Sequence, residues 1–136
     1  MKIFNDDINT ILIKQMDAGT LRQQVIADNI ANVNTPGFKK SAVNFQHQLK
    51  AALDGNSMGM KTTNKRHIGG GGPDKLEELA PEVIKTEGTS MKAGLNNVDL
   101  DEEMVNLAAN TLMYQFAARV KSDRGNSLSY VIKGGR

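Results

Sequence analysis

The stretch that decides the fold reads Asn29-Ile30-Ala31-Asn32-Val33-Asn34-Thr35-Pro36-Gly37-Phe38. The proline pushes Thr35 towards an extended conformation. Pro36-Gly37 suits the centre of a type II turn, because proline presets the first φ and glycine accepts a positive φ at the next position. Asn32 or Asn34 can cap the last carbonyls of a preceding helix or take the left-handed conformation. We expect these asparagines to be capping or interface groups rather than core, although the turn by itself is also typical of an ordinary helix stop.

A long helix is predicted upstream of this turn, from about Asp6 to Val33. Its seam follows the four–three spacing of a coiled coil and contains Leu12, Met16, Gly19, Gln23, Ile26, Ile30 and Val33. Gly19 and Gln23 interrupt the seam, and a glycine inside a helix costs about 1 kcal/mol. Gly19 is therefore also a candidate for close approach by a neighbouring helix.

A second long helix is predicted from Asp99 to the C-terminal glycines. Asp99 and Glu102 fit a capping pair at its start. One seam contains Leu100, Met104, Leu107, Thr111, Tyr114 and Ala118, and a second, adjacent seam contains Val105, Ala109, Leu112, Phe116 and Val120. A helix with two adjacent seams can contact more than one neighbour. Gly134-Gly135 is expected to end it.

The middle of the chain, residues 46–97, differs in composition. It holds eight of the 13 glycines, two of the three prolines and no aromatic residue. Lys50–Leu53 is expected to belong to a short helix, and Pro81–Thr86 to a short strand because it contains adjacent β-branched residues. Gly69–Gly72, followed by proline, is typical of a linker.

These patterns together predict a mostly α-helical protein. Residues 1–45 carry the first helix and the Asn/Pro-Gly turn, and residues 46–97 are expected to form a flexible, partly disordered linker with a short β element. Residues 98–136 are expected to form a helix that pairs with the first one in a coiled-coil hairpin.

The composition indicates a chain that relies on partners. Its 136 residues include four phenylalanines, two tyrosines and no tryptophan, so the side chains that dominate core burial are scarce. Apolar residues make up 39% and charged residues 24%. A folded state is therefore expected to need a partner that covers its apolar faces. The net charge of +2 is too small to favour nucleic-acid binding.

No reactive site is predicted. The absence of cysteine excludes disulfides, thiolate metal ligands and cysteine nucleophiles. His47 and His67 lie 20 residues apart without clustered carboxylates, and the acidic residues at Asp99–Glu103 are explained by helix capping. The serines have no histidine at motif spacing. We expect no catalytic, metal-binding or cofactor-binding residue.

No membrane segment or cleavable signal is predicted either. The longest apolar runs have three residues, as in Ile11-Leu12-Ile13. A transmembrane helix needs about 20 apolar residues, and a signal peptide needs about seven or more.

Periodicity alone leaves several functions open. Two terminal helices with apolar seams suit a structural subunit of a helical assembly. In such an assembly, head-to-tail contacts between subunits do not close into a ring and so generate a helical tube. The two helices equally suit a small coiled-coil adaptor or regulatory protein. A nucleic-acid binder that uses the basic residues near the C-terminus is a weaker alternative, because the same helix begins with acidic residues.

The stretch Asn29–Phe38 closely resembles the N-terminal signature of the flagellar rod, hook and hook-associated axial proteins. Three further stretches are similar to a short proximal rod protein of that family, namely Lys61–Ile68 (Thr-x-x-x-His-Ile), Gly94–Met104 and Asn110–Gln115, together with the closing Val131–Gly135. One departure is Gly94-Leu95-Asn96-Asn97, where the family more often has Asp-Gly-Asn.

The resemblance implies a non-enzymatic rod subunit in the periplasm, exported by the flagellar type III apparatus without a cleaved signal. It implies contacts with other rod proteins, with basal-body adapter and export-gate proteins, and with further copies of the chain. The implied assembly signature is Asn29, Ile30, Ala31, Asn32, Asn34, Thr35, Pro36, Gly37 and Phe38. The apolar seams predict the helix interfaces, which are Leu12, Met16, Ile26, Ile30 and Val33 on the first helix and Leu100, Met104, Leu107, Leu112, Tyr114 and Phe116 on the second.

Overall fold

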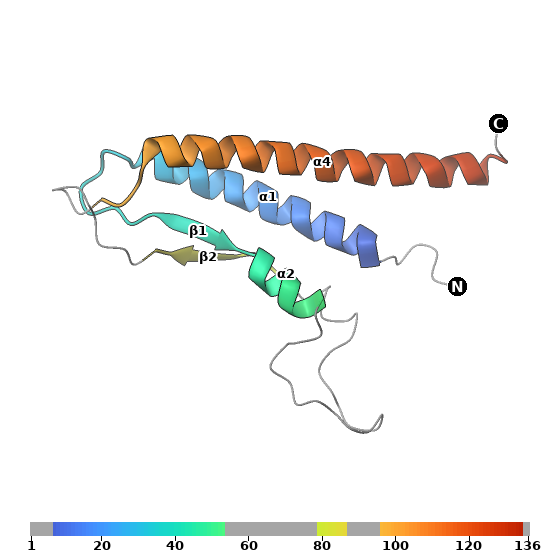
Figure 1. Ribbon diagram of the computed structural model, residues 1–136, viewed down its shortest axis with the longest axis horizontal. Helices are drawn as coiled ribbons and strands as arrows, with labels where there is room; N and C mark the ends of the chain where they lie inside the picture. The colour runs from blue at the N-terminus through green and yellow to red at the C-terminus, as the bar shows by residue number, and fades with distance from the viewer. Residues whose placement is uncertain (1–6, 54–78, 87–95, 135–136) are drawn as a thin grey trace, which may run out of the picture.

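The computed structural model of the protein describes residues 7–53, 79–86 and 96–134. Its elements, in chain order, are α1 (Asp7–Ala31), β1 (Ser41–Asn44), α2 (Gln46–Leu53), β2 (Glu82–Lys85) and α4 (Leu100–Ile132). Figure 1 shows α1 and α4 side by side and running in opposite directions, with the strands along the other side of α1. The predicted class, a mostly helical chain with a long helix towards each end and a small β element between them, is confirmed.

The two strands pair antiparallel, with Ser41 opposite Lys85 and Asn44 opposite Glu82. The predicted strand at 81–86 is thus confirmed as β2, whereas β1 was not predicted. The short helix predicted at 50–53 is the end of α2. The predicted flexible linker, with the His-Ile and glycine-run stretches, falls mainly on residues 54–78 and 87–95, which lie outside the described residues.

The turn after α1 has the predicted chemistry. Gly37 has a φ of 76°, and the N–H of Phe38 donates to the carbonyl of Thr35 at 3.3 Å. This positive φ and this bond between the first and fourth residues are those of a type II turn. Asn32 acts as a cap, since its Nδ2 donates to the carbonyl of Asp28 at 2.8 Å.

The ends of α4 also follow the sequence. Asp99 caps the first turn, where its carboxylate accepts a hydrogen bond from the N–H of Asp101 at 3.0 Å. Glu102 does not complete the capping pair, because its carboxylate pairs with Lys40 instead. At the other end, Gly134 has a φ of 70° and donates its N–H to the carbonyl of Val131.

The core of the described residues is small and partly polar. Its buried apolar members are Ala18, Val25, Ile26, Phe45, Val98 and Ala117, and its buried polar members are Asn29, Asn96, Glu103 and Asn110. Phe45, the largest fully buried side chain, directly follows β1. Four polar groups at the centre require matched hydrogen-bond partners, because an unpaired buried polar group is costly.

Candidate functional site

Asn29 joins three separate segments at the end of α1. Its Nδ2 donates to the carbonyl of Ser41 at 2.8 Å, and its Oδ1 accepts from the N–H of Ser41 at 3.0 Å. The second Nδ2 hydrogen bond, at 3.0 Å, goes to the Oε2 of Glu103 on α4. The side chain is 1% exposed. The expectation that Asn29 is a capping or interface group outside the core was therefore wrong, because its three partners make this polar side chain compatible with burial.

Two further asparagines fasten the turn to the start of α4. Asn96 Nδ2 lies 2.8–3.0 Å from the carbonyls of Asn32, Val33 and Thr35. One buried side-chain amide therefore holds three backbone carbonyls of the turn in place. Asn97 Oδ1 accepts from the N–H of Lys40 at 2.6 Å.

Asn97 also connects the start of α4 to the residue that follows β2. Asn97 Nδ2 donates to the carbonyl of Thr86 at 3.2 Å, directly after β2. The N–H of Thr86 in turn donates to the carbonyl of Lys40 at 2.8 Å. Asn96 and Asn97 thus each have a distinct role in this chain, while Gly94 and Leu95 lie outside the described residues.

Lys40 is the charged member of this junction. Its ammonium lies 2.8 Å from a carboxylate oxygen of Glu102 and 2.8 Å from Oε1 of Glu103, and the Glu103 side chain is 1% exposed. Burial lowers the pKa of Lys40, but hydrogen bonds and charge attraction from the two glutamates outweigh burial, so the pKa lies above its ordinary value of 10.5. The buried carboxylate of Glu103 is thus paired with a cation and with Asn29.

The α1–α4 contact is polar where a coiled coil is usually apolar. The buried residues of α4 are Glu103, Asn110 and Ala117, which are spaced by seven. Asn110 Nδ2 donates to the carbonyl of Gly19 at 2.9 Å, and its Oδ1 accepts from Arg22 Nη1 at 3.4 Å. We call the buried face of α4 that contains Glu103, Asn110 and Ala117 the polar seam, because two of its three residues are polar.

Gly19 allows the two helices to approach closely. A Cβ atom at this position would lie 3.3 Å from Cδ2 of Tyr114, which is tighter than an ordinary contact. The prediction that Gly19 marks close approach by a neighbouring helix is confirmed.

The predicted interface residues of α1 lie at different depths. Ile26 is buried, and the remaining four are half-buried, namely Leu12, Met16, Ile30 and Val33. Gln23, expected in the same seam, is exposed, whereas Asn29 is buried and Arg22 is half-buried. The face of α1 that meets α4 is therefore rotated by about one residue from the predicted seam.

The predicted interface residues of α4 are mostly exposed. Leu107 is half-buried, and Leu100, Met104, Leu112, Tyr114 and Phe116 are exposed, with Leu112 at 67% and Phe116 at 71%. The second predicted seam therefore faces away from α1. Ala109 is an exception, since it lines a pocket with Arg22 and Ile26 of α1. We call the remaining exposed residues, Val105, Leu112 and Phe116, the outward stripe. The sequence singled out this stripe but missed the polar seam, whose only signal is the spacing of seven.

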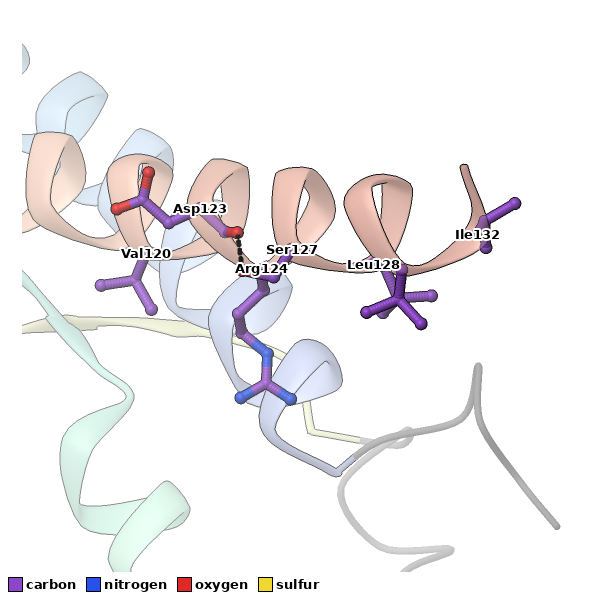
Figure 2. A pocket seen from close by; sticks show the side chains of 7 residues that line it. Val120, Asp123, Arg124, Ser127, Leu128 and Ile132 are labelled. Atoms are coloured by element: carbon purple, nitrogen blue, oxygen red, sulfur yellow. Dashed lines mark hydrogen bonds between the residues drawn. The ribbon is translucent and has the colours of Figure 1, made fainter. Parts of the chain in front are cut away.

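Further apolar surface lies on the last turns of α4. An open groove of about 690 Å³ lies along this part of the helix. Figure 2 shows the side chains that line it, with the Oγ of Ser127 donating to the carbonyl of Asp123. Its lining is Val120, Asp123, Arg124, Ser127, Leu128, Val131 and Ile132. All of these described lining residues belong to α4, and the groove is open to solvent.

The described residues offer little for reactive chemistry. Within ranges 7–53, 79–86 and 96–134, no three His, Cys, Asp or Glu side chains are grouped so as to hold a metal ion. His67, one of the two histidines, lies outside the described residues. No helix in this part of the chain is both long enough and apolar enough to span a membrane.

Comparison with known proteins identifies close full-length relatives. The family model for flagella basal body rod protein matches residues 16–39, which include the Asn29–Phe38 signature. The chain is 32% identical to flagellar basal body rod protein FlgB of Borreliella burgdorferi over 88% of this chain and 91% of the relative. It is 31% identical to FlgB of Bacillus subtilis over 100% of both chains, and 30% identical to FlgB of Yersinia enterocolitica over 96% and 98%.

These relatives confirm the resemblance found in the sequence. Several of them align over nearly the whole chain, so the likeness extends well beyond the N-terminal signature. The two long helices with exposed apolar residues fit a protein that is built into a larger structure. The chain belongs to the FlgB family of flagellar basal body rod proteins.

Proposed function

We propose that this structural subunit of the flagellar basal body rod joins its neighbours through the outward stripe of α4, and that it is not an enzyme. The observation that carries the proposal is the exposure of large apolar residues, above all Leu112 and Phe116, along one face of a 33-residue helix. Contiguous apolar surface of this kind is typical of protein interaction sites. The polar seam, by contrast, already has its partners within the chain.

The proposal includes the surroundings of the subunit. Its neighbours are other rod proteins, further copies of the chain, and the adapter and export-gate proteins of the basal body. It acts in the periplasm and arrives through flagellar type III export without a cleaved signal. Membership of a rod protein family supports assembly with flagellar components in the basal body. The alternative of a small coiled-coil adaptor or nucleic-acid binder is not favoured, because the near full-length relatives are rod proteins.

The proposal assigns different tasks to the two sets of predicted interface residues. The signature Asn29–Phe38 fixes the bend that leaves α1, and Asn96 supports this role by holding three carbonyls of the turn. Ile26 holds the hairpin together, since it is 4% exposed. Leu112 and Phe116 are left for neighbouring subunits.

Charged substitutions test this division in the flagellated bacterium that makes the protein. Leu112→Asp and Phe116→Asp are expected to leave the circular dichroism of the purified chain unchanged but to abolish rod assembly and motility. Ser122→Asp is the matched control, because Ser122 is also exposed and lies about 120° round the helix from Phe116. Ile26→Asp is expected to abolish motility by a different route, through loss of the folded hairpin. Normal swimming by the Leu112→Asp strain would contradict the proposed surface.

A further inference from the structure

The polar seam is unusual in its position. Seams between paired helices are normally apolar, and a single polar residue in such a seam lowers stability but fixes the alignment of the helices. Here two of the three buried residues on α4, Glu103 and Asn110, are polar and lie seven residues apart. Larger apolar side chains of the same helix, such as Leu112 and Phe116, are exposed instead.

Each polar residue of the seam has its own hydrogen-bond or ion-pair partners on α1 or next to it. The carboxylate of Glu103 accepts a hydrogen bond from Asn29 at 3.0 Å and forms an ion pair with Lys40 at 2.8 Å. The amide of Asn110 both donates and accepts, and it meets the carbonyl of Gly19 and the guanidinium of Arg22.

The backbone of α1 at Gly19 also fits this contact with Asn110 of α4. The carbonyl that accepts from Asn110 belongs to Gly19, a residue without a side chain, and a Cβ atom there would lie 3.3 Å from Cδ2 of Tyr114 on α4. An α1 helix shifted along α4 would place other residues opposite Asn110 and Glu103. Both polar groups would then be buried without these partners, which is unfavourable.

We infer that Glu103 and Asn110 are a register lock. They select α1 of the same chain, in one alignment, as the partner of this face of α4, and they thereby determine which residues point away from the hairpin. The lock belongs to the isolated chain, so it holds whether or not the outward stripe is the surface that contacts other subunits.

Spin labels can measure the alignment, because the chain has no cysteine of its own. Cysteines introduced at the exposed positions Gln24 on α1 and Ser122 on α4 carry the labels, and pulsed electron paramagnetic resonance gives their separation in the dilute full-length protein. A shift of α1 by one heptad moves the labels about 10 Å along the helix axis. The test variants are Asn110→Leu and Asn110→Leu combined with Glu103→Leu. The matched control is Asn106→Leu, which adds the same side chain at an exposed position of α4.

The unsubstituted protein and the control are expected to show one narrow distance distribution. The Asn110→Leu variants are expected to keep their helical content and to show a broadened distribution, or a second one shifted by about 10 Å. A single unchanged distance in both variants would overturn the inference. Loss of helical circular dichroism in Asn110→Leu but not in Asn106→Leu would also overturn it, because Asn110 would then support the fold as a whole rather than its alignment.

Discussion

Replacing Asn29 with alanine removes the buried carboxamide that joins α1, β1 and α4. The substitution eliminates two hydrogen bonds to the backbone of Ser41 and one to the carboxylate of Glu103. Alanine preserves the helix, since it has the highest helix propensity. The loss of stability therefore reports on the junction rather than on α1 itself.

The size of the effect follows from these three bonds. Each bond to Ser41 contributes about 1 kcal/mol, and the bond to the ionised Glu103 contributes about 2 kcal/mol. Because bonds in one network are not independent, we expect the free energy of unfolding to fall by about 3 kcal/mol. Small domains have a free energy of unfolding of about 5–15 kcal/mol. The variant is therefore expected to remain folded, with only a small free energy of unfolding left.

Urea unfolding followed by circular dichroism measures this difference. Asn34→Ala is the control, because Asn34 lies in the same signature but is exposed, and its effect is expected to stay within about 0.5 kcal/mol. A loss below about 1 kcal/mol for Asn29→Ala would refute the reasoning, since even one ordinary hydrogen bond is worth that much.

Three further substitutions test other parts of the structure. Gly37→Ala should destabilise the protein by about 1–2 kcal/mol in urea unfolding, because a φ of 76° is strained for any residue with a Cβ; an unchanged midpoint would show that the turn relaxes freely. Gly19→Ala should be nearly neutral, because its gain in helix propensity offsets a tight contact with the partly exposed Tyr114, whereas Gly19→Val should lower the melting temperature clearly. Lys40→Met should lose stability relative to the unsubstituted protein at pH 8, and the difference should shrink at strongly alkaline pH. The pKa of Lys40 is raised above 10.5, so its contribution is fully present below that pH and is lost as the pH rises through the raised pKa; a difference that stays constant up to pH 12 would contradict the ion pairs.

Much of the fold was predictable because it depends on local chemistry. Pro36-Gly37 determines a turn wherever it occurs in the chain, and Asp99 begins a helix through a bond two residues away. β2 was also predicted, because its centre consists of two adjacent β-branched residues. β1 was missed, since Ser41–Asn44 has polar ends and its partner strand lies about 40 residues further along the chain.

The polar seam was missed for a different reason. Hydrophobic periodicity follows apolar residues, and it therefore predicts two mainly apolar seams on α4 that leave out Glu103 and Asn110. The structure instead buries Glu103 and Asn110, because Asn29, Lys40 and Gly19 present matching groups. Such matches connect residues more than 60 positions apart, so spacing along one helix does not reveal them.

Photo-crosslinking in intact basal bodies tests the central claim most directly, namely that α4 uses one face within the chain and a different face between subunits. A photoreactive residue replaces Phe116 on the outward stripe in one strain and Ala117 on the buried face in another. We predict that the probe at 116 joins the chain to a neighbouring rod subunit, whereas the probe at 117 reacts only with α1 of the same chain. Assembled rods in which the probe at 116 forms no product with another subunit would contradict the account.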